Sequence, residues 1–264
     1  MPADAGAPLT DGRLEVVALD GIPEVVPGDD LVGFLGDAIE RSAGALPLRE
    51  DDVLVVTQKV VSKAEGAIVD LTTVEPRPEA VEFATAYDRD PRQIEVVLRE
   101  AVRVVRMANG VLITETHHGF VCANGGIDAS NVGPASGQVV TLLPRDPDTS
   151  AASIRAAIRE RFGVDVPVLV SDSFGRPWRW GITDVAIGIS GMLPLEDLRG
   201  VADHDGRVMR STVRAVADQV ASAAELAFGK TTARPAAIVR GAHPTRGEAT
   251  IKDALIPGEF DLFR

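Results

Sequence analysis

The stretch VPVLVSDSFGRPWRWGITDVAIGIS, residues 166–190, contains two apolar runs of strand length separated by a polar, glycine-bearing segment. Residues 166–172 begin as a buried strand and run straight into polar residues, and residues 184–190 form a second apolar run. Continuous apolar runs of this length are typical of strands that are covered on both faces. The stretch therefore predicts two strands, with Asp172 at the end of the first.

Strands and helices mix along the rest of the chain without strict alternation. Further strands are expected at residues 13–19, 53–57, 102–107 and 236–241, with a hairpin across 111–123. The spacing of apolar residues predicts helices from about residue 31, at 91–101, at about 150–162 and at about 211–228. This order favours an α+β fold with mixed or antiparallel sheets and packed helices over a doubly wound parallel sheet.

No linker rich in Pro, Gly and Ser divides the chain. Residues 1–12 are expected to be a flexible tail. Residues 13–264 are expected to form a single module, with two lobes that interleave in sequence.

The composition of the 264 residues, 45% hydrophobic and 25% charged, is that of a globular protein, without an apolar run long enough to span a membrane. The N-terminus does not resemble a signal peptide, and a cytoplasmic location is expected. A single cysteine, Cys122, excludes an internal disulfide and a multi-cysteine zinc site. The net charge of −12 argues against nonspecific nucleic-acid binding, whereas an anionic small ligand would need local lysines, arginines or metal ions.

Three polar segments follow predicted strands and could carry chemistry. In the first, residues 57–66, Lys59 and Lys63 are four apart and Gln58 offers hydrogen bonds, a set that suits phosphate oxygens. The same pattern is equally expected of a solvated helix start. In the second, NGGIDASN at 124–131, Asp128 and Asn131 could face a metal or a sugar hydroxyl, or Asp128 could simply form a turn.

The third segment, residues 171–184, is the strongest of the three. Asp172 ends a predicted strand, where functional groups gather in α/β-type sheets. Arg176 and Arg179 supply positive charge, and both tryptophans of the chain lie nearby. Stacked arginines in a core anchor would explain the same residues, but the combination favours a ligand site.

Two other motifs are interpreted as structural. AFGKTT at 227–232 contains Gly-Lys-Thr but has Ala224 where a P-loop needs its first glycine. Gly229 is therefore predicted to cap a helix, although Lys230 could still contact an anion. His117 and His118 are expected to be exposed at the tip of the hairpin.

Taken together, these segments resemble the coenzyme F-420 γ-glutamyl ligase family, of the actinobacterial type but without the C-terminal flavin reductase domain. The resemblance lies in five stretches that appear in family order: GIPEVVPGDDL, DVLVVTQKVVSKAEG, CANGGIDASN, LVSDSFGRPWRWGITDVAIGISG and AAIVRG.

The resemblance implies a reaction in which GTP, as co-substrate, phosphorylates the terminal carboxylate of the deazaflavin cofactor precursor. The amine of L-glutamate then displaces phosphate, and later rounds add γ-linked glutamates. It also implies two divalent cations, magnesium or manganese, and a homodimer.

Carried over position by position, the resemblance implies metal ligands and catalytic residues at Asp128 and Asp172, with Ser173 contacting the second metal. Nucleotide contacts are implied at Gly21, Ile22, Pro23, Glu24, Gln58, Lys59, Lys63 and Asn131. Lys230, which could contact an anion, is included with the nucleotide contacts. It stands near the position where members of the family have a loop glutamate for the second metal, and this chain departs from the family there. Either Lys230 replaces the charge of a cation, or that metal is held differently. Arg176 and Arg179 are expected to bind the negative charge of the acceptor.

Overall fold

The computed structural model describes residues 12–42, 47–129 and 137–262. Its largest sheet has the strand order β1-β12-β2-β8-β9, formed by β1 (Glu15–Ala18), β12 (Ala236–Arg240), β2 (Asp52–Thr57), β8 (Val168–Arg176) and β9 (Arg179–Ser190). Strands β2 and β8 run parallel, and the other neighbours are antiparallel. The sheet is therefore mixed, and the predicted α+β class is confirmed.

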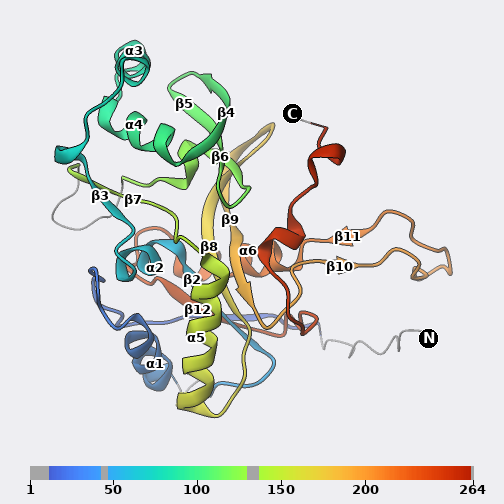
Figure 1. The fold of residues 1–264 in the computed structure, drawn as a ribbon. Coiled ribbons are helices and arrows are strands. Elements are labelled where there is room, and N and C mark those ends of the chain that lie inside the picture. The colour runs from blue at the N-terminus through green and yellow to red at the C-terminus, as the bar shows by residue number, and fades with distance from the viewer. Residues whose placement is uncertain (1–11, 43–46, 130–136, 263–264) are drawn as a thin grey trace.

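The two central strands are buried on both faces. All five residues of β12 and all but the last of β2 are buried, as their unbroken apolar sequences predict. Helix α5 (Pro147–Phe162) packs on β8 and β9 and contacts α1 (Leu31–Ser42), while α6 (Val216–Phe228) packs on β9, β12 and β1. Figure 1 shows α5 in front of the sheet, with α1 beside it.

The outer strand β9 is attached to both helices by carboxylates. Asp148 of α5 accepts from the backbone N–H of Ile189 at 2.8 Å. From α6, Asp218 accepts from the N–H of Ala186 at 3.0 Å, and Glu225 accepts from that of Asp184 at 2.9 Å. These bonds saturate donors that β8 does not use and fix both helices relative to the strand.

A buried ion pair joins β2 to β12 at the end where β2 begins. Arg240 donates to the two Asp52 oxygens at 2.7 and 2.8 Å and to the carbonyl of Pro47 at 2.7 Å. Asp52 is fully buried and Arg240 is 9% exposed. The pair is thus a bidentate, desolvated contact, and removing either partner alone would strongly destabilise the fold.

A second group of elements is inserted between β2 and β8. It holds α3 (Pro78–Tyr87), α4 (Pro91–Glu100), β4 (Ala101–Ala108), β5 (Val111–Thr116) and β6 (Val121–Ala123). Strands β3 (Ile68–Asp70) and β7 (Val139–Thr141) pair where the chain enters and leaves the group. Figure 1 shows this group at one end of the molecule. It has small apolar clusters of its own, and the expected division into two interleaved lobes remains a prediction.

The remaining elements are short. Helix α2 (Gln58–Ala64) follows β2 directly, and β10 (Glu196–Asp197) pairs with β11 (Val213–Arg214) in an arm that projects from the body in Figure 1. Short 3₁₀ turns lie at Leu71–Thr73, Asn124–Gly126, Ile251–Ala254 and Gly258–Phe260. No helix in the described ranges is long and apolar enough to cross a membrane.

Two helix predictions need correction, and one helix was missed. The helix predicted from about residue 211 begins at Val216, because residues 213–214 pair with β10. The helix predicted from Ser150 begins at Pro147, with Asp146 capping the N–H of Thr149. Helix α3 was not predicted. Most of the predicted N-terminal tail, residues 1–11, lies outside the described residues.

Candidate active site

A cleft of about 900 Å³ opens where the parallel pairing of β2 and β8 stops, at Thr57 and Ser171. Strand β8 continues to Arg176, so Asp172 lies within the strand and not at its end as predicted, because the β8–β9 hairpin extends the pairing beyond the apolar run. Because these two strands are parallel, the segments that follow or end them meet at one edge of the sheet. The loop before α1 and the loop after α6 complete its walls. Of the residues predicted from the sequence, the cleft is lined by Ile22, Pro23, Glu24, Gln58, Lys59, Lys63, Asp128, Asp172, Ser173 and Lys230.

Three predicted site residues that the structure describes are not among those that line the cleft. Gly21 lies just outside it, and its carbonyl accepts from Arg41. Arg176 and Arg179 sit at the exposed end of the β8–β9 hairpin, where Arg176 donates to the carbonyl of Trp180. Asn131 lies outside the described residues.

The tryptophans also do not line the cleft. Trp178 is 82% exposed and Trp180 is 99% exposed. The residues of the ligand site expected across 171–184 therefore do not lie together, because the β8–β9 hairpin is long and separates its base from its tip. Its base, with Asp172 and Ser173, faces the cleft, and its tip carries the arginines and tryptophans to the surface.

Asp128 is held in the cleft by its own backbone and by a lysine. Its N–H and C=O pair with Thr141, and its Oδ2 lies 2.6 Å from Lys59 Nζ. The preceding Gly125 and Gly126 both have positive φ, and a Cβ on Gly126 would meet Leu143 at 2.8 Å. Only glycine fits that turn without strain, so the bare sequence around Asp128 reflects the bend that brings it to Lys59.

Helix α2 presents two further polar side chains. Lys63 is 5% exposed, and its Nζ lies 2.5 Å from Glu24 Oε1, which connects the helix to the loop before α1. Gln58 is buried and its amide nitrogen donates to Ser62 Oγ and to the carbonyl of Leu142. The amide donors of Gln58 are thus used inside the protein, which leaves its carbonyl oxygen for any ligand.

Asp172 is a carboxyl group without a positively charged side chain at ion-pair distance among the described residues. Its pKa is raised to about 7, and burial is the largest cause. The neighbouring carboxylates of Asp184 and Asp128 act in the same direction, whereas the N–H of Ser173 and the charge of Lys59 act against it. Within the described ranges, no lysine or arginine forms an ion pair with Asp172. A cation bound in the cleft would favour the charged form of Asp172 and lower its pKa.

The sequence prediction missed Asp184, which is 1% exposed and lies at the base of the cleft. Its Oδ2 accepts from Ser171 Oγ at 2.9 Å, and its Oδ1 accepts from Ser173 Oγ at 2.7 Å and Lys230 Nζ at 2.9 Å. Lys230 also lies 2.7 Å from Glu225 Oε1. A carboxylate directly before the apolar residues 185–189, within β9, is the signal that could have found Asp184.

Arg234 was also missed. It lines the cleft and forms a 2.6 Å ion pair with Asp20. The predicted role of Gly229 is confirmed, because it caps α6 and donates to the carbonyl of Glu225.

The oxygen atoms that the cleft offers suit a hard cation only when a bound phosphate ligand adds oxygens of its own. Among the described residues, no three His, Cys, Asp or Glu side chains gather closely enough to hold a metal. Magnesium is usually held by one or two carboxylates together with phosphate oxygens and water. Asp128 and Asp172, with a hydroxyl at Ser173, fit that second pattern.

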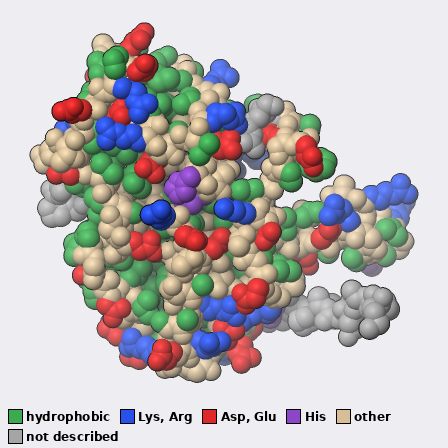
Figure 2. Space-filling model, in the orientation of Figure 1, with side chains coloured by type: hydrophobic (Ala, Val, Ile, Leu, Met, Phe, Trp, Pro, Cys, Tyr) green, Lys and Arg blue, Asp and Glu red, His purple; other side chains and the backbone are tan. Residues whose placement is uncertain are grey.

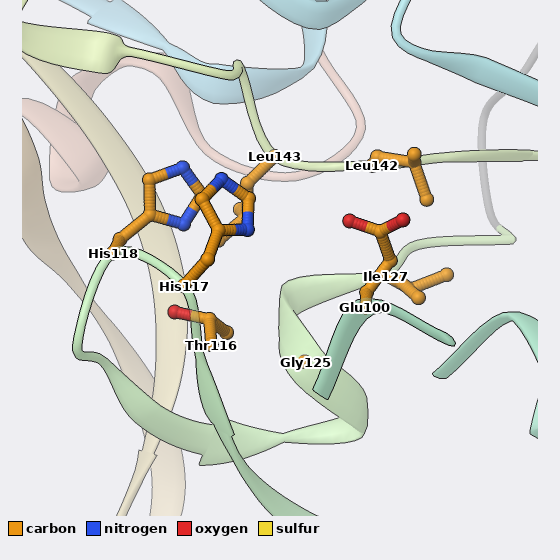
Figure 3. A pocket seen from close by; sticks show the side chains of 8 residues that line it. All are labelled: Glu100, Thr116, His117, His118, Gly125, Ile127, Leu142 and Leu143. Carbon is orange, nitrogen blue, oxygen red and sulfur yellow. The ribbon is translucent and has the colours of Figure 1, made fainter. Parts of the chain in front are cut away.

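A second, much smaller pocket corrects the prediction for the histidines. Figure 3 shows the rings of His117 and His118 side by side, with Glu100 facing the same space. His117 is exposed as predicted, but His118 is buried, and its Nε2 contacts the carbonyl of Pro144 at 2.8 Å. The pocket measures about 10 Å³, room for a single water molecule and not for a substrate.

Charge on the surface is mixed. Figure 2 shows acidic and basic side chains interspersed over the visible face. The chain as a whole has a net charge of −12, but three lysines, Lys59, Lys63 and Lys230, line the cleft.

Comparison with known proteins identifies the family of the chain. A coenzyme F420:L-glutamate ligase from Methanothermobacter thermautotrophicus is 39% identical over 95% of this chain and 99% of the relative. The protein of that name from Methanopyrus kandleri is 44% identical over 88% of this chain and 90% of the relative. The profile of the F420-0:Gamma-glutamyl ligase family matches residues 21–241. The chain belongs to the F420-0:gamma-glutamyl ligase family.

Proposed function

We propose that this chain is a GTP-dependent ligase that joins L-glutamate to the deazaflavin precursor F420-0 and then adds γ-linked glutamates. The names of its relatives support the two substrates. The observation that carries the proposal is the cleft itself, where Lys59, Lys63 and Lys230 meet two acidic side chains, Asp128 and Asp172. Such a site suits a triphosphate and an anionic acceptor.

In the proposed reaction, the γ-phosphoryl group of GTP passes to the terminal carboxylate of the acceptor and GDP leaves. The amine of glutamate attacks the carbonyl carbon of the acyl phosphate, an amide bond forms and inorganic phosphate leaves. Catalysis of this kind is mainly positioning and charge neutralisation. Two like charges 4 Å apart repel by about 4 kcal/mol at an effective dielectric near 20, so the lysines are needed to assemble the reactants.

The roles of individual residues follow from their places in the cleft. Asp128 and Asp172 would hold magnesium or manganese, which spreads the negative charge of the phosphates when bound. Lys59 and Lys63 would contact phosphate oxygens. The loop of residues 21–24 would contact the nucleotide, and the Lys63–Glu24 pair holds that loop against α2.

The direct test is to incubate the protein with GTP, manganese, glutamate and the deazaflavin precursor. The product mass should increase by one glutamyl residue, with one GDP released per amide bond. Lys63→Met should weaken GTP binding at least tenfold, and the exposed Lys252→Met serves as the matched lysine control. The absence of both product and GDP, from protein that is folded and binds nucleotide, would instead indicate a non-catalytic nucleotide-binding module.

A second candidate is a ligase for a different carboxylate acceptor. It is favoured by one observation: Arg176 and Arg179, expected to hold the acceptor, do not line the cleft. Comparing GDP release across acceptors decides between the two, since the first proposal requires that the deazaflavin precursor be preferred.

The homodimer expected from the sequence is also proposed. Light scattering coupled to size-exclusion chromatography measures it, and a mass corresponding to one chain would rule it out.

A further inference from the structure

One end of the cleft already contains a cation that belongs to the chain. Lys230 Nζ lies 2.5 Å from Ser173 Oγ and 2.9 Å from Asp184 Oδ1. It also lies 2.7 Å from Glu225 Oε1. An ammonium group has three donors and no acceptor, and these three contacts use all of them. The oxygens of β8, β9 and α6 thus form a cation site, and its occupant is the lysine.

The oxygens are held in place before any ligand binds. Ser173 donates its proton to Asp184, so a lone pair of the Ser173 hydroxyl faces Lys230. Glu225 uses its other oxygen to accept from the backbone N–H of Asp184. Because Asp184 is buried, withdrawal of Lys230 would leave a desolvated carboxylate without a counter-charge. The lysine is therefore a fixed part of this site.

The other end of the cleft is different. Asp172 has no lysine or arginine partner at ion-pair distance within the part of the chain that the structure describes. Lys59 contacts Asp128 through Oδ2. The Asp172 carboxylate thus leaves acceptor capacity for an added cation, whereas Asp184 already accepts two hydroxyl protons and an ammonium.

We propose that Lys230 provides a built-in positive centre in place of a second divalent ion, so that the site takes one exchangeable divalent ion, at Asp128 and Asp172. An ammonium and a divalent ion compete for the same oxygens and repel each other. The inference rests on the proposed function only for the phosphate ligand that completes the metal site.

Counting bound manganese tests this without any turnover. The protein is titrated with Mn²⁺ in the presence of saturating GDP, and free Mn²⁺ is followed by electron paramagnetic resonance. The wild type and Lys252→Met should bind one ion per chain. Lys230→Met, which keeps the length of the side chain and removes its charge, should bind two, because the oxygens of Ser173, Asp184 and Glu225 become available.

Each possible ion count either supports or overturns the proposal. Two ions in the wild type, or none, would overturn the proposal, as would a count of one in both the wild type and folded Lys230→Met. If Lys230→Met does not fold, the wild-type count decides alone. A wild type that binds one ion but forms no glutamyl product would refute the proposed function and leave this assignment intact.

Discussion

Replacing Asp52 by Asn should destabilise the fold strongly while leaving the cleft unchanged. The substitution removes the charge that two Arg240 nitrogens contact at 2.7 and 2.8 Å, and it places an amide against a guanidinium, donor against donor. It also affects the N–H of Arg49, which donates to the same carboxylate.

The expected cost follows from burial. Breaking a buried ion pair on one side costs about 3–5 kcal/mol. Asp51 and Glu15 remain near Arg240 and offset part of its charge, so we expect about 3 kcal/mol. For a chain of this size that lowers Tm by roughly 6–12 °C. Asp52 and Thr57 stand at opposite ends of β2, about 17 Å apart at the rise of a strand, so nucleotide affinity at low temperature should not change.

Urea and thermal unfolding measure the effect, and nucleotide titration checks the cleft. The double variant Asp52→Asn/Arg240→Met removes both charged partners and should recover part of the loss. A Tm for Asp52→Asn within about 2 °C of the wild type, outside the range expected from the size scaling, would show that the pair is not the desolvated contact described here.

Three further predictions concern other parts of the chain. Asp172→Asn should abolish metal-dependent turnover yet raise Tm slightly at pH 8 without metal, because burial raises the pKa of that carboxyl to about 7 and its charged form opposes folding; a lower Tm would contradict this. Gly188→Ala should cost about 1–3 kcal/mol in urea unfolding, since its Cβ would stand 2.4 Å from the backbone at the start of α5, whereas Gly175→Ala, with nothing within 4 Å, should be neutral. Glu95→Gln should cost about 2 kcal/mol at pH 7. The Arg77 hydrogen bond lowers the pKa of Glu95 to about 2, so this stabilisation should be complete above about pH 4.5 and should disappear as the pH falls toward 2; a cost independent of pH would refute the assignment.

The central strands were predictable because they obey a single rule. Residues 53–56 and 166–170 are apolar without interruption, and such runs become interior strands whatever their neighbours are. Asp128 and Asp172 could be paired only through family resemblance, since they are distant in sequence and come together through the parallel pairing of β2 and β8 and the Thr141 bridge.

The sequence expectations and the structure differ where contacts between distant segments decide the outcome. The length of the β8–β9 hairpin moves Arg176 and Arg179 away from Asp172, and no local pattern encodes that length. His118 is buried, and its Nε2 contacts the carbonyl of Pro144, which is 26 residues away in sequence. Asp184 was missed because its importance lies in the partners that reach it from β8 and from the loop after α6.

The carboxylates on β9 also limit how copies of this chain can associate. An outer strand with unpaired backbone groups invites another chain to extend the sheet. Here Asp148, Asp218 and Glu225 already occupy N–H groups along β9, and the helices that carry them stand in the way. Self-association through sheet extension at this strand is therefore disfavoured.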